Sequence, residues 1–186
     1  MAKTNAPDLS KHFEMLGRIT HDWNFLEHQI AVLCWLYTKD IEAAHVFTSR
    51  LRNAERAAAL LEISERRDAR PRVRGAIKFL VGAFNILREN RNALVHSHHW
   101  HLSGDDVVWT RGSKSKPTTL ITALASLSDL RELHSDIVKA REYADGLQNY
   151  LMPDDYMNPG RWVLKRDTLP RRFRKPRKML QPRPSM

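Results

Sequence analysis

Three side chains in the middle of the chain combine a fixed cation, a neutral polar group and a titratable imidazole. They are Arg91, Asn92 and His96, within the stretch RNALVH at positions 91–96. Arginine neutralises phosphate charge, and histidine moves a proton to or from a ribose hydroxyl or a leaving oxygen. The set therefore suits chemistry on a phosphodiester bond.

These residues fall at the end of a helix that is predicted to run from Pro71 or Arg72 towards Val95. Its apolar stripe is Val73, Ile77, Leu80, Phe84, Leu87 and Leu94. Position 91 lies four residues after Leu87 and three before Leu94, so we expect Arg91 to point into a helical bundle or an interface. A lone buried guanidinium is costly, and Glu27 is by pattern the nearest candidate for a supporting ion pair.

Three more amphipathic helices are predicted. The first begins near Asp8 or Ser10, the second runs from a break near Lys39-Asp40 to Asp68-Ala69-Arg70-Pro71, and the last is capped by Ser128. Their stripes are Leu9, Phe13, Leu16, Trp23, Leu26, Ile30, Leu33 and Tyr37 in the first helix, Ala44, Phe47, Leu51, Ala54, Ala58 and Leu61 in the second, and Leu130, Leu133, Ile137, Ala140, Tyr143, Ala144, Leu147 and Tyr150 in the last.

The period changes between the last two helices. Residues 99–102 and 107–110 flank the turn-forming residues 103–106, which predicts a small β-hairpin. The expected fold is all-α: an up-and-down four-helix bundle with this hairpin inserted before its last helix. We expect residues 1–152 to form the bundle domain and residues 153–186 to form a basic tail rich in proline and arginine.

The stretch from Arg91 to His96, placed at the end of the third helix, resembles the signature of the HEPN superfamily (higher eukaryotes and prokaryotes nucleotide-binding domains). That signature is an arginine followed by a polar residue and, after four to six intervening residues, a histidine. The resemblance covers roughly residues 9–150. It implies a homodimer in which two motifs meet, and metal-independent cleavage of RNA to a 2′,3′-cyclic phosphate. It further implies that His96 is the catalytic acid or base, Arg91 the phosphate-binding cation and Asn92 the residue that orients them.

The net charge of +10 lies almost entirely in the tail. Residues 161–186 carry ten Lys/Arg and one acidic residue, which gives +9. Like charges repel, so we expect a flexible or partner-ordered tail that binds the nucleic-acid backbone. An anionic membrane surface, or no partner at all, is the alternative. The residues that we expect to bind nucleic acid are Arg171, Arg172, Arg174, Lys175, Arg177 and Lys178.

Other features limit the remaining possibilities. The chain has no apolar run long enough to span a membrane, and its first residues, MAKTNAPDLS, lack the pattern of a signal peptide. Cys34 is its single cysteine and cannot form an intrachain disulfide. A reducing cytoplasm is therefore the expected location. No cofactor is expected, and the histidines at 96, 98, 99 and 101 favour a hairpin face over a metal site. The resemblance thus implies a HEPN-type ribonuclease, and a toxin or phage-defence effector with an antitoxin or other partner protein is the biological class that fits it. The alternatives are an inactive HEPN-like module that binds nucleic acid or a partner protein, and a structural protein in which Arg91 pairs with Glu27.

Overall fold

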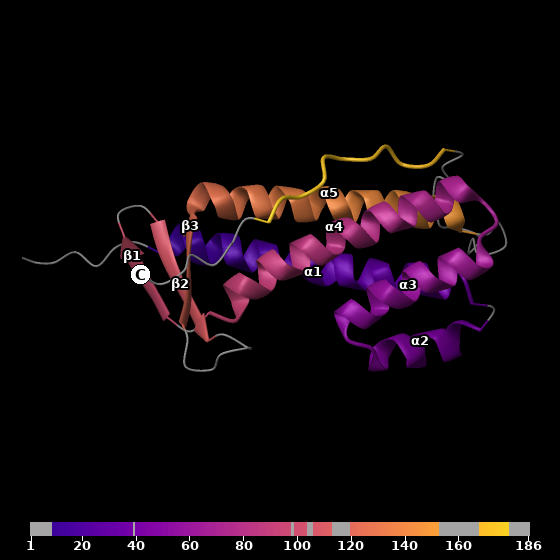
Figure 1. Ribbon diagram of the computed structural model, residues 1–186, viewed down its shortest axis with the longest axis horizontal. Coiled ribbons are helices and arrows are strands. Elements are labelled where there is room, and N and C mark those ends of the chain that lie inside the picture. The colour runs from indigo at the N-terminus through magenta and orange to yellow at the C-terminus, as the bar shows by residue number, and fades with distance from the viewer. Residues whose placement is uncertain are drawn as a thin grey trace, which may run out of the picture. The chain divides into compact units, whose positions relative to one another are not determined.

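The computed structural model describes residues 9–38, 40–97, 99–103, 106–112, 120–152 and 168–178 (Figure 1). Within these residues the chain is built mainly from helices, as predicted. The helices are α1 (Ser10–Trp35), α2 (Ile41–Arg50), α3 (Asn53–Arg67), α4 (Pro71–Val95) and α5 (Leu127–Leu151). The strands are β1 (His99–Ser103), β2 (Asp106–Gly112) and β3 (Leu120–Ser126). No helix among the described residues has the length and apolar character needed to cross a membrane.

The chain forms two compact units, to which α1, α4 and α5 each contribute. One unit comprises Met1–His21, Ile86–Asp136 and Pro176–Met186, and the other comprises Asp22–Asn85 and Ile137–Lys175. In the second unit Trp23 of α1 stacks on Phe84 of α4, with ring centroids 4.8 Å apart. Burial of such large apolar side chains is the main stabilising contribution to each unit.

The predicted stripe of α4 is confirmed, and that of α5 is confirmed except at Tyr150, which is only partly buried. In α4 the six predicted apolar residues are all buried, and in α5 every predicted position from Leu130 to Leu147 is buried. The stripe of α1 is wrong at its beginning, because Phe13 is 56% exposed whereas its neighbour His12 is only 7% exposed. Both ring nitrogens of His12 are buried without a hydrogen-bond partner among the described residues.

The second predicted helix is in fact two helices, α2 and α3, separated at Leu51 and Arg52. Both residues adopt an extended backbone, and the amide of Arg52 donates a 2.7 Å hydrogen bond to the carboxylate of Glu55 in the first turn of α3. This bond satisfies an amide that α3 itself leaves without a partner. The break changes the helical phase, so α3 buries Ala57, Leu60 and Ser64 and not the predicted Ala58 and Leu61.

The three strands form an antiparallel sheet of order β1-β2-β3. In the first pair Trp100 lies opposite Trp109, and Ser103 lies opposite Asp106. The third strand was not predicted. It leads directly into α5, where Ser126 and Asp129 cap the helix: the amide of Asp129 donates to the Ser126 hydroxyl at 3.1 Å, and the Asp129 carboxylate accepts from the Ser126 amide at 2.9 Å. The predicted cap, Ser128, instead lies inside α5.

Candidate active site at the end of α4

The predicted motif lies where α4 ends. The helix finishes at Val95, and the amide of His96 still donates to the carbonyl of Asn92 at 3.3 Å. The hydroxyl of Ser97 donates to the carbonyl of Ala93 at 2.6 Å, and its amide donates to the carbonyl of Leu94 at 3.3 Å, so both satisfy carbonyls in the last turn of the helix. His96 follows directly after the helix with an exposed side chain.

Arg91 and Asn92 are linked through their side chains. Nη1 of Arg91 donates to Oδ1 of Asn92 at 3.2 Å, and both residues are partly buried. Nε of Arg91 is buried and has no hydrogen-bond partner among the described residues. A buried guanidinium donor without an acceptor is unfavourable, so the end of α4 presents a cationic group with unused hydrogen-bonding capacity.

Asn90, and not Arg91, is the polar residue that is fully buried on this face, with 3% exposure. Its side-chain amide donates a 2.9 Å hydrogen bond to the backbone carbonyl of Arg177. Position 90 lies three residues after Leu87 and four before Leu94, so the same spacing that drew attention to Arg91 also fits Asn90. The sequence therefore carried a signal for Asn90 that was missed.

Glu27 lies in the other unit. Its carboxylate accepts hydrogen bonds from the indole of Trp23 and from the side-chain amide of Asn53, which connects α1 with the start of α3. Arg91 belongs to the unit that contains the end of α4. The predicted ion pair between Glu27 and Arg91 stays a prediction.

Part of the predicted flexible tail packs on the helices. We call residues 168–178 the C-terminal segment; Figure 1 draws it in yellow beside α4 and α5. In the unit that contains the first part of α4, the ring of Phe173 contacts Phe79 and Tyr143 edge-on, with centroids 5.2 and 5.7 Å away. The guanidinium of Arg172 lies 5.4 Å from the Phe79 centroid and donates to the carbonyl of Gly75 at 3.2 Å. Burial raises the pKa of Tyr143 in this cluster.

The rest of the C-terminal segment contacts the unit that contains the candidate site. Pro176 is buried, and the carbonyl of Arg177 accepts the bond from Asn90. The side chain of Arg177 pairs with Glu132 at 2.6 Å, and that of Lys178 pairs with Glu89 at 2.8 Å. The tail, which the sequence predicts to be flexible or ordered by a partner, packs on its own chain at these residues, because aromatic packing and a buried backbone bond outweigh charge repulsion. Residues 153–167 and 179–186 lie outside the described part of the chain.

The six residues that were predicted to bind nucleic acid fall into two groups. Arg172, Arg177 and Lys178 contact the helices, as described above. Arg171, Arg174 and Lys175 are exposed and make no hydrogen bond or ion pair with any residue that the structure describes. The second group is thus available to an anionic partner without the loss of an existing contact.

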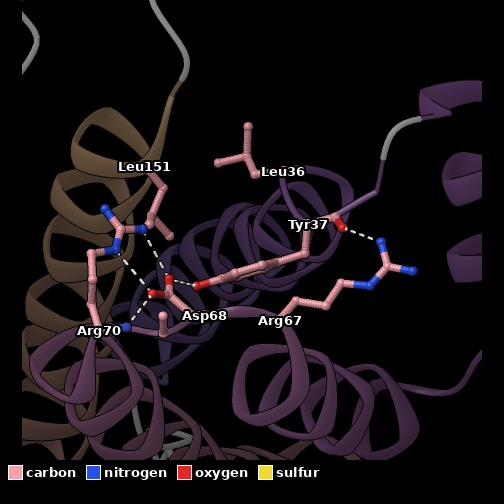
Figure 2. Close-up of a pocket in the computed structure, with 7 residues that line it drawn as sticks. Leu36, Tyr37, Arg67, Asp68, Arg70 and Leu151 are labelled. Carbon is pink, nitrogen blue, oxygen red and sulfur yellow. Dashed lines mark hydrogen bonds and ion pairs between the residues drawn. The ribbon is translucent and has the colours of Figure 1, made fainter.

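A separate cavity of about 420 Å³ lies among the ends of α1, α3 and α5. Figure 2 shows Asp68 at its base, held by Tyr37 and Arg70. The Tyr37 hydroxyl donates to Asp68 at 2.8 Å, and Arg70 donates to both carboxylate oxygens at 2.9 Å. The Arg70 guanidinium lowers the pKa of Asp68 to about 2, and burial raises that of Tyr37. Asp68 is thus a fully bonded carboxylate that links the turn after α1 to the turn between α3 and α4, and it is not suited to act as a base.

Metal binding has no support in the part of the chain that the structure describes, where no group of three or more His, Cys, Asp or Glu side chains is placed to hold an ion. The side chains of the histidines at 98, 99 and 101 are outside the described ones, as are those of Trp100 and Trp109.

Comparison of the chain with family models, curated proteins and solved structures finds no match.

Proposed function

We propose that the protein is a HEPN-type endoribonuclease that cleaves RNA without a metal ion and leaves 2′,3′-cyclic phosphate ends. In this proposal α1, α3, α4 and α5 are the helices of a HEPN-like four-helix bundle, β1 and β2 are its inserted hairpin, and two copies of the chain form a dimer. The observation that carries the proposal is the placement of Arg91, Asn92 and exposed His96 within one turn of the end of α4.

The reaction needs two proton transfers and one cation. A base takes the proton of the ribose 2′-hydroxyl, the oxygen attacks the adjacent phosphorus, and the bond from phosphorus to the 5′ oxygen breaks as an acid returns a proton to that oxygen. In the dimer, the two copies of His96 supply the base and the acid. Arg91 neutralises the charge that develops on the phosphoryl oxygens.

Asn92 has the role of holding Arg91. Its side-chain oxygen accepts from Nη1 of Arg91, which restricts the guanidinium to fewer rotamers before substrate arrives. A preorganised donor costs less to bring to the transition state than a mobile one. We therefore expect Asn92→Ala to lower the cleavage rate constant more than it weakens RNA binding.

The test is cleavage of end-labelled single-stranded RNA in the presence of EDTA. Wild type should give products that end in cyclic phosphate, His96→Ala should lose at least about a hundredfold in rate, and Arg91→Gln should lose a similar factor. The matched control is His45→Ala, which removes another exposed histidine, on α2.

Two results would count against the nuclease. If clean wild-type protein cuts no RNA but binds it, the chain is an inactive HEPN-like module that binds nucleic acid. If it neither cuts nor binds RNA, the remaining interpretation is a module that binds an antitoxin or another partner protein. Cleavage that survives His96→Ala would remove His96 from the mechanism.

A further inference from the structure

Two neighbouring residues of α4 bind the C-terminal segment immediately before the motif begins. Glu89 pairs with Lys178, and Asn90 donates to the carbonyl of Arg177. The next residue is Arg91. The backbone at positions 176–178 is therefore attached to the same turn of helix that carries the candidate catalytic arginine.

The attachment does not depend on the charged side chains. Asn90 is 3% exposed and bonds to the backbone of residue 177, and Pro176 is buried beside it in the chain. Buried hydrogen bonds of this kind are poorly replaced by water. This anchor keeps the Arg177 and Lys178 side chains beside the end of α4 whether or not they are paired.

The two ion pairs differ from that anchor because they are exposed. The side chains of Arg177 and Glu132 are 60% and 39% exposed, and those of Lys178 and Glu89 are 58% and 52% exposed. Exposed pairs are screened by salt and contribute little to stability. Guanidinium and ammonium groups bind phosphate oxygens as readily as carboxylate oxygens, so a phosphodiester can replace Glu132 and Glu89 without disturbing the anchor.

We propose that Glu89 and Glu132 act as an intramolecular brake on RNA binding: they occupy Arg177 and Lys178 until RNA phosphates displace them next to Arg91. The proposal rests on the RNA substrate proposed above and adds how that substrate reaches the site. In the free protein the two cations and two carboxylates sum to zero charge, so binding of RNA requires an exchange of partners. Removal of the carboxylates should therefore tighten binding.

The experiment measures affinity for a fluorescent 2′-O-methyl oligoribonucleotide, which lacks the attacking hydroxyl, over a series of KCl concentrations. The double variant Glu89→Gln with Glu132→Gln should bind about three- to tenfold more tightly than wild type at low salt, as expected from the loss of two exposed pairs. Arg177→Gln with Lys178→Gln should bind more weakly, with a slope of log affinity against log salt that is shallower by about 1.4.

Two comparisons separate the brake from a general charge effect. Glu65→Gln with Glu142→Gln removes two exposed acidic side chains that do not pair with the C-terminal segment, and it should change affinity less than twofold. In the Arg177→Gln, Lys178→Gln background, the Glu89 and Glu132 substitutions should have no further effect, since their partners are gone. Circular dichroism melting of each variant confirms that it is folded.

The outcomes separate this proposal from the proposed function. If wild type binds and cleaves RNA but the Glu89, Glu132 variant binds no more tightly, the brake is refuted and the nuclease stands. If wild type has no affinity for RNA, both the proposed nuclease and the brake are refuted. An oligoglutamate peptide that competes more strongly than RNA would overturn the assignment of RNA as the displacing partner in favour of an acidic protein.

Discussion

The hydroxyl of Tyr37 donates a 2.8 Å hydrogen bond to Oδ2 of Asp68, and so links the turn after α1 to the turn between α3 and α4. Arg70 holds the same carboxylate through two side-chain bonds and its own backbone amide. Asp68 is 4% exposed, so each of these bonds replaces water that the carboxylate has lost. The connection explains how a polar turn is buried inside one unit without an unsatisfied charge.

Substitution of Asp68 should therefore have a pH-dependent effect on stability. The pKa of Asp68 falls below its ordinary value, to about 2, because Arg70 favours the charged form. A depressed folded-state pKa gives stability that is present above the unfolded pKa, near 4, and is lost as pH falls towards 2. Asp68→Asn should cost about 1–2 kcal/mol at pH 7, after allowance for the exposure of Arg70, and this difference should shrink between pH 4 and pH 2.

The measurement is the urea-unfolding free energy of both proteins across that pH range. Tyr37→Phe should cost about 1 kcal/mol with a weaker dependence on pH, since it removes one bond but leaves Arg70 on the carboxylate. The matched control is Asp145→Asn on the exposed side of α5. A difference between Asp68→Asn and wild type that stays constant down to pH 2 would contradict the prediction.

Phe173→Ala should destabilise the protein by about 1–3 kcal/mol, because it removes a partly buried ring that contacts both Phe79 and Tyr143. Chemical denaturation checks the value. Arg171→Ala, two residues earlier and exposed, should leave stability within about 0.5 kcal/mol of wild type. Equal unfolding of Phe173→Ala and wild type would mean that the C-terminal segment adds nothing to the fold.

Cys34 should be unreactive in the folded protein. Its side chain is 2% exposed, and burial raises the pKa of the thiol to about 12. The thiolate is the reactive form, so raising the pKa from 9.0 lowers its fraction at pH 8 by roughly a thousandfold. Labelling with a disulfide reagent should need denaturant, and rapid labelling of the native protein would show that α1 opens locally.

Ser126→Ala should cost about 1 kcal/mol, because the hydroxyl of Ser126 caps the first turn of α5 together with Asp129. Ser128→Ala should cost almost nothing, since Ser128 is exposed inside the helix. Thermal or urea unfolding of the pair distinguishes the cap seen in the structure from the one that the sequence suggested. The opposite order of the two losses would restore Ser128 as the cap.

Helical periodicity predicted α4 and α5 well, because long runs of apolar residues at three- and four-residue spacing have one interpretation. It did not decide between adjacent residues that fit the same stripe. Positions 12 and 13 both fit between Leu9 and Leu16, and positions 90 and 91 both fit between Leu87 and Leu94. In each case the less obvious residue, His12 or Asn90, is the buried one.

The reason for Asn90 is a partner that no local pattern contains. Its acceptor is the carbonyl of Arg177, in a segment whose composition predicted flexibility. Similarly, no proline or glycine marks the break between α2 and α3. The residue that precedes α3 is Arg52, where a serine or threonine is usual, and its backbone amide donates to Glu55. Motif spacing located the candidate site, but long-range contacts determined what surrounds it.

The length of chain between Asn90 and Arg177 also bears on how the protein is made. The two residues are 87 positions apart, and Gly75 and Arg172 are 97 apart. Ribosomes add roughly 5–20 residues per second, so the C-terminal segment is synthesised roughly 4–17 seconds after the part of α4 that it contacts. During that time the ring of Phe79 and the amide of Asn90 are without these partners. A nascent chain halted before residue 168 would expose them to chaperones and proteases, which gives the cell a means of removing incomplete copies.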